Sequence, residues 1–199
     1  MHTLQINGPR LLAQLQTLAD IGRTETNACC RLALTDEDKA GRDLVVDWMK
    51  ALGMSVCVDP IGNVFGVRTG TRPELAPIMT GSHTDTVRTG GIYDGNYGVL
   101  AGLEVVATLN DAKLNTERSI VVGIFTNEEG ARFAPDMLGS LVYVGGMPLD
   151  EALAIKAIDG AVLGDELKRI GYQGSAPLGV HKPHAFVELH IEQRPLLDA

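Results

Sequence analysis

Residues 119–126, SIVVGIFT, form an uncharged and almost entirely apolar run. A short run that is rich in β-branched residues is typical of a strand covered on both faces, as in a parallel sheet. A helical pattern precedes it, and a strand pattern over residues 76–82 precedes that helix. The apolar positions of the helix are Val99, Leu100, Leu103, Val106 and Leu109. Strand, helix and strand in this order predict a parallel crossover and therefore an α/β fold.

The other elements are predicted from the same periodicities. We expect helices over residues 7–21, 35–52, 149–157 and 162–170, and strands over residues 54–58, 63–68 and 185–191. Thr35 followed by acidic residues is a typical helix start, and Gly53 is a typical stop. The sequence contains no repeat, low-complexity tract or linker, so we expect one domain.

The composition excludes several classes of protein. With 199 residues, 45% of them hydrophobic, the chain is long enough to bury a core without disulfides. A net charge of −8 without a dense basic run argues against nucleic acid and membrane surfaces as partners. Three cysteines without framework spacing, and an N-terminus without a signal-peptide pattern, favour reduced thiols and the cytoplasm.

Imidazole and carboxylate side chains follow the predicted strands. His83 and Asp85 come directly after strand 76–82, Asp94 lies at the entrance of the next helix, and Glu128 and Glu129 follow strand 119–126. His190 lies within the last predicted strand. Ligands of open α/β sheets bind at the carboxyl ends of the strands, so these residues should meet.

Such a set of nitrogen and oxygen donors suits zinc, manganese, cobalt or nickel. His83 and Asp85 alternate by two, so the carboxylate of Asp85 could orient the imidazole. Asp94 could bridge two ions, and one of the adjacent Glu128 and Glu129 could bind metal while the other accepts a proton. Each motif alone more often marks a buried histidine, a turn or a solvated loop. Their joint placement favours a metal centre.

The motifs GSHTDTVRTGGIYDGNYGVLAGLE (81–104), FTNEEGARF (125–133) and ELHIEQ (188–193) closely resemble the hydantoinase/carbamoylase group of the M20 metallopeptidase-like family. The resemblance spans most of the chain. It implies a three-layer αβα aminopeptidase-like catalytic domain with a mixed, mostly parallel sheet. It also implies two divalent ions, with zinc as the first choice and manganese, cobalt or nickel as alternatives.

The resemblance assigns roles to most of these residues. His83, Asp94, Glu129 and His190 match metal ligands, with Asp94 as the bridging one. Glu128 matches the general base, and Gln193 matches a residue near the ureido group of the substrate. Asp85 keeps the supporting role that its spacing to His83 predicts. For Arg132 and Phe133, substrate contact and packing of the loop after Glu129 are both open.

The implied activity is hydrolysis of the ureido C–N bond of N-carbamoyl-L-amino acids, allantoate, ureidoglycolate or β-ureidopropionate. The alternatives are a peptidase or deacylase of the same family and a non-catalytic metal-binding chain. Family members are longer and carry a lid and dimerisation domain. We therefore expect residues 1–199 to be the N-terminal portion of an incomplete catalytic domain, inactive alone, from a homodimeric enzyme. Arg194 also departs from the glycine that usually follows this HIEQ motif.

Overall fold

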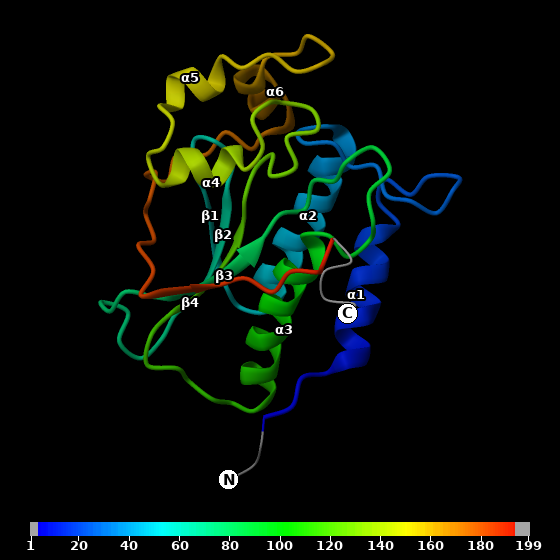
Figure 1. The fold of residues 1–199 in the computed structure, drawn as a ribbon. Helices are drawn as coiled ribbons and strands as arrows, with labels where there is room; N and C mark the ends of the chain where they lie inside the picture. Colours follow the sequence, from blue (N-terminus) through cyan, green and yellow to red (C-terminus); the bar gives the residue numbers. More distant parts are fainter. Residues whose placement is uncertain (1–3, 194–199) are drawn as a thin grey trace.

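The structure, a computed structural model, describes residues 4–193 and contains one five-stranded sheet in the order β1-β2-β4-β3-β5 (Figure 1). The strands are β1 (Ser55–Val58), β2 (Val64–Arg68), β3 (Ile78–Ser82), β4 (Ile120–Ile124) and β5 (Ala185–Val187). β3 pairs in parallel with β4 and β5, whereas β2 is antiparallel to β1 and β4. All strands except β2 therefore run in the same direction, and the sheet is mixed and mostly parallel, as predicted.

Strand β4 lies in the middle of the sheet and is buried along its whole length. Ile120, Val122 and Ile124 belong to the main core on one face. Val121 points to the other face, where it packs with Phe65 and Met79. The apolar run therefore forms a strand covered on both faces, and α3 with β3 and β4 forms the predicted parallel crossover.

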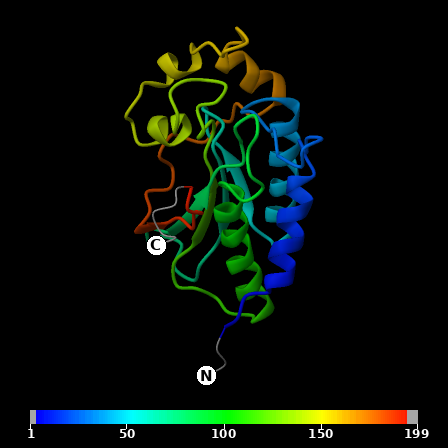
Figure 2. The ribbon, with the colours of Figure 1, turned by 45° about the vertical axis from the view of Figure 1, so that its right-hand side comes forward.

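Helices α1 (Gly8–Ala19), α2 (Asp36–Ala51) and α3 (Asn96–Asp111) cover one face of the sheet (Figures 1 and 2). The side chains of Asn7 and Thr35 cap the first turns of α1 and α2. On the other face, Tyr143 of α4 (Leu138–Tyr143) packs against Phe65 and Phe125. Helices flank the sheet as an αβα domain requires.

Three segments differ from the sequence prediction. β5 ends at Val187 rather than at residue 191, because the ladder stops at Thr80 and the Ser82 hydroxyl then donates to the Glu188 carboxylate. The helix expected over residues 149–157 is the shorter α5 (Leu149–Leu153), followed by α6 (Leu163–Ile170). Periodicity did not indicate α4. Arg194 lies outside the described residues.

The three cysteines are free thiols, as predicted. Within residues 4–193 no helix has the length and apolar character needed to cross a bilayer.

Candidate metal centre

His83 lies directly after β3 and is almost completely buried. Its Nδ1 donates to the backbone carbonyl of Asp85 at 2.9 Å, which leaves Nε2 with its lone pair free in the neutral tautomer. Nε2 is buried without a hydrogen-bond partner among the described residues. A histidine held at one ring nitrogen and open at the other is prepared to bind a cation.

Asp94 lies in the turn between β3 and α3, and its Oδ1 is 3.9 Å from His83 Nε2. The next residue, Gly95, has φ +64°, and a Cβ added there would lie 2.5 Å from three atoms of the His83 ring. Only glycine allows the Asp94 turn to approach the imidazole this closely.

His190 follows β5 and brings a second imidazole to the same place, with Nε2 3.3 Å from Asp94 Oδ1. One ligand atom from each of His83, Asp94 and His190 lies within 4.8 Å of the others. His83 Nε2 and Asp94 Oδ1 are buried and have no hydrogen-bond partner in the part of the chain that the structure describes. These two unpartnered atoms, together with the nearby Nε2 of the more exposed His190, fit a divalent ion such as zinc.

Glu128 and Glu129 follow β4, and their backbone amides donate to the two carboxylate oxygens of Asp85, each at 3.2 Å. Glu128 Oε2 lies 3.3 Å from His83 Nε2. Glu129 Oε1 is buried and has no hydrogen-bond partner within residues 4–193. Glu128 therefore lies beside the histidine, and Glu129 follows it at the same strand end.

Asp85 holds the site differently from the sequence expectation. Its carboxylate is 3.9 Å from His83 Nδ1, and its backbone oxygen, rather than its side chain, fixes the imidazole. The side chain instead accepts hydrogen bonds from the backbone amides of Glu128 and Glu129. Asp85 therefore connects the ends of β3 and β4.

The crowded charges shift several pKa values. Burial raises the pKa of Glu129 to about 7, with the charges of Asp94 and Asp85 adding to the effect. Burial also raises the pKa of Glu128. Burial would lower the pKa of His83, but the carboxylates of Asp85 and Glu128 more than offset it, so this pKa lies above its usual value. Such shifts identify a place where a cation would relieve repulsion.

A small cavity of about 180 Å³ is lined by Glu128, Glu129 and His190. Gln193 lines it, and its amide donates to Asp94 Oδ2, so this predicted residue also joins the site. Asp136 and Met137 line it as well, although no motif in the sequence indicated them.

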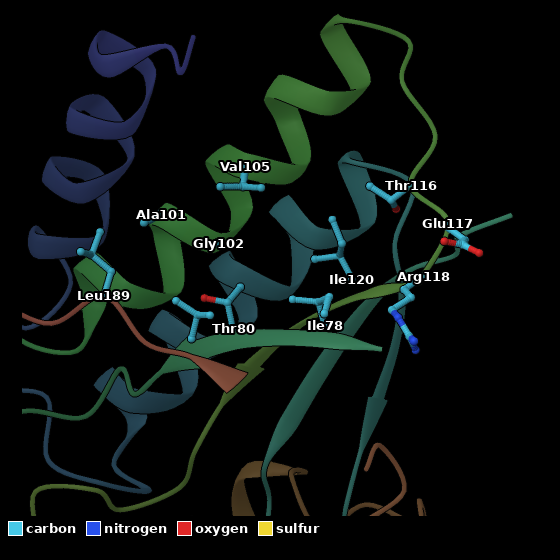
Figure 3. A pocket seen from close by; sticks show the side chains of 11 residues that line it. Ile78, Thr80, Ala101, Gly102, Val105, Thr116, Glu117, Arg118, Ile120 and Leu189 are labelled. Atoms are coloured by element: carbon cyan, nitrogen blue, oxygen red, sulfur yellow. The ribbon is translucent and has the colours of Figure 1, made fainter. Parts of the chain in front are cut away.

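Two other features lie outside the site. Arg132 binds Asp159, Glu166 and the carbonyl of Ala33, so it packs the loop after Glu129. Another cavity, of about 520 Å³, lies between α3 and the β3 edge of the sheet (Figure 3). Its lining contains none of the predicted metal or catalytic residues.

The model of peptidase family M20/M25/M40 matches residues 79–199. An N-carbamoyl-L-amino-acid amidohydrolase of Rhizobium meliloti is 47% identical over 98% of this chain and 47% of its own length. A ureidoglycolate hydrolase of Arabidopsis thaliana is 33% identical over 98% of this chain and 43% of its own length. The chain therefore spans about half the length of the curated relatives it matches.

Among solved structures, a hydantoinase/carbamoylase family amidase of Burkholderia vietnamiensis is 52% identical, with a TM-score of 0.97 over 100% of this chain and 48% of that chain. It carries the same fold over the whole length compared. The chain therefore belongs to the M20/M25/M40 peptidase family and is similar to hydantoinase/carbamoylase family amidases.

Proposed function

We propose that this chain is the metal-binding portion of a two-metal amidohydrolase that cleaves the ureido C–N bond of N-carbamoyl-L-amino acids or related ureido compounds. The observation that supports it most is the convergence of His83, Asp94 and His190 within 4.8 Å, beside two carboxylates with raised pKa values. Relatives named as N-carbamoyl-L-amino-acid amidohydrolases and ureidoglycolate hydrolases support the ureido substrate class over a peptide bond.

His83, Asp94 and His190 would hold one divalent ion, and Glu129, whose Oε1 is buried without a hydrogen-bond partner among the described residues, would join Asp94 at a second. We propose zinc as the first choice and manganese, cobalt or nickel as alternatives. When bound, the ions would polarise the ureido carbonyl and lower the pKa of the attacking water.

Glu128 is the proposed general base. Its carboxylate is 3.3 Å from His83 Nε2, so it can reach a water beside the metal ligands. Burial raises its pKa, which makes it able both to take the proton from water and to return it to the leaving nitrogen. Gln193 is held by Asp94 at the rim, where its amide can bind the ureido group. For an N-carbamoyl substrate the products are the free amino acid, ammonia and carbon dioxide.

Three further features of the protein are proposed from the same likeness. The chain supplies the N-terminal portion of the catalytic domain, and the longer enzyme forms a homodimer in the cytoplasm. The three free thiols support the cytoplasm as its compartment.

Metal content tests the proposal on this chain directly. The purified chain, equilibrated with Zn²⁺ or Mn²⁺ and desalted, should retain bound metal. Asp94→Ala should lose the metal at both sites, whereas His83→Ala or His190→Ala should mainly weaken one. His184→Ala is the matched control, because that exposed histidine lies before β5 and away from the cluster. A parent chain that retains no more metal than His83→Ala would refute the site.

A chimera tests the substrate class. The chain would replace the corresponding half of the Rhizobium meliloti relative, to which it is 47% identical. Ammonia release is then measured with N-carbamoyl-L-amino acids, allantoate and β-ureidopropionate, and acetate release is measured with an N-acetyl amino acid. A folded, metal-loaded chimera that cleaves only the N-acetyl compound would replace the ureido assignment by a deacylase.

A further inference from the structure

Arg31 is a fully buried arginine that belongs to none of the motifs described above. Its guanidinium makes four hydrogen bonds to oxygen atoms, and Nη1 also donates to Cys29 Sγ at 3.5 Å. Nε donates to the Thr84 carbonyl at 2.7 Å, and Nη2 donates to Asn96 Oδ1 at 2.9 Å. Nη1 donates to the carbonyls of Leu18 at 2.9 Å and Ile21 at 2.7 Å. All four acceptors are neutral carbonyl or amide oxygens rather than carboxylates.

The acceptors belong to the segments that carry the metal ligands. Thr84 stands between His83 and Asp85, and Asn96 is the first residue of α3, two positions after Asp94. One rigid guanidinium therefore holds the His83 segment and the Asp94 segment at a fixed distance. On the other side, the close approach of Gly95 to the His83 ring limits the same separation.

The backbone of Arg31 strengthens this connection. Its N–H donates to Thr86 Oγ1 at 2.8 Å, and its carbonyl accepts from the Thr86 N–H at 2.9 Å. Two residues earlier, Cys29 and Gly90 exchange a pair of backbone hydrogen bonds. Residues 29–31 are thus hydrogen-bonded to residues 86 and 90, in the segment that follows His83.

The carboxyl end of α1 stabilises the buried cation. Burying a cation costs several kcal/mol unless its donors are satisfied. Leu18 lies in the last turn of α1 and Ile21 lies two residues beyond the helix, at the end where backbone carbonyls carry partial negative charge. The Leu18 carbonyl also accepts from the Ile21 N–H at 3.2 Å. A planar guanidinium can bind these carbonyls and the two ligand segments together, whereas a lysine ammonium is a single point.

We propose that Arg31 is a positioning residue of the metal centre, which sets the spacing of His83 and Asp94 without touching the metal. This inference rests on the proposed function. Metal ligands must hold their distances to about 0.2 Å, so a small shift of either segment weakens binding. Loss of supporting contacts behind metal ligands typically reduces affinity by about 10–100-fold.

The test compares Arg31→Lys with Arg42→Lys. Arg42 is also fully buried, but it binds Asp38, Gly62 and Thr126 rather than the two ligand segments. Zn²⁺ affinity is measured by chelator competition, and the visible spectrum of bound Co²⁺ reports the ligand geometry. We expect Arg31→Lys to lose at least about tenfold in affinity and to change the Co²⁺ spectrum. Arg42→Lys should keep the parental Zn²⁺ affinity and Co²⁺ spectrum, even if its melting temperature falls as far as that of Arg31→Lys.

Each outcome decides. A folded Arg31→Lys chain with parental affinity and spectrum overturns this inference alone, and so do equal losses in both variants, which would make the role merely structural. A parent chain that takes up neither metal refutes the proposed function and this inference with it. If Arg31→Lys does not fold, Asn96→Ala removes the bond from Arg31 to α3, together with the bond from Asn96 Nδ2 to the Ile92 carbonyl. It should show the same loss of affinity, and parental affinity there overturns the inference.

Discussion

Gly95→Ala should disrupt both the fold and the metal centre, because two costs act at one position. Gly95 has φ +64° and ψ −48°, a conformation that costs a residue with a side chain about 1–3 kcal/mol. The new Cβ would lie 2.5 Å from the His83 ring, so the ring must move by roughly 0.9 Å to reach an ordinary contact. Forcing such a shift in a packed site costs about another 1–3 kcal/mol.

The expected loss in free energy of unfolding is therefore about 2–6 kcal/mol, equivalent to at least about 4 °C in melting temperature for a chain of this size. Gly91→Ala is the matched control, because a Cβ at Gly91 would meet nothing within 4 Å and its φ is not positive. Urea denaturation of the metal-free chains measures the difference. If Gly95→Ala and Gly91→Ala unfold within about 0.5 kcal/mol of each other, the proposed contact with His83 is wrong.

Three other predictions concern the chemistry of the site. In the chimera, Glu128→Gln should retain metal and lose turnover by about 100-fold or more, whereas Glu129→Gln should lose metal. If Glu128→Gln keeps the parental turnover, Glu128 is not the general base. Because Glu129 has a pKa of about 7 and Asp59 one of about 6, both raised by burial, the folded metal-free chain binds more protons than the unfolded chain. Its melting temperature should fall as the pH rises from about 5 to 8, and Zn²⁺ affinity should rise over the same range; the opposite slopes would contradict these pKa values. The separate chain of 199 residues should bind metal without hydrolysing N-carbamoyl-L-amino acids, because the family that it resembles has longer members with a lid and dimerisation domain. Chelator-sensitive ammonia release would contradict this.

Prediction from the sequence succeeded where one physical rule decided the outcome. The apolar run of β4 has no polar side chain to place at a surface, so it could only become a central strand. His83, Asp94, Glu128 and Glu129 meet because the carboxyl ends of neighbouring parallel strands lie at one edge. Their clustering followed from topology rather than from any one motif.

Prediction was weaker where the outcome depended on a partner elsewhere in the chain. The length of β5 is set by β3, whose register allows only three pairs, from Ala185 to Val187. Arg31 carried no signal because its acceptors are mainly backbone carbonyls, and the sequence pattern does not specify which carbonyls a buried arginine will reach. Asp136 was also missed, because only the folded loop after β4 brings it to the cavity beside Glu129.

Asp85 and Arg31 support the proposed metal centre by fixing different pairs of segments. The Asp85 carboxylate binds the Glu128 and Glu129 amides, so it fixes the end of β4 relative to the end of β3. Arg31 fixes the end of β3 relative to the start of α3. Together they join all three segments that carry His83, Asp94 and the two glutamates. Burial, together with the charges of neighbouring carboxylates, raises the pKa values of Glu128 and Glu129. The bonds that hold these groups together therefore oppose a repulsion that a bound cation would relieve. These bonds would therefore preorganise the proposed metal centre before an ion binds.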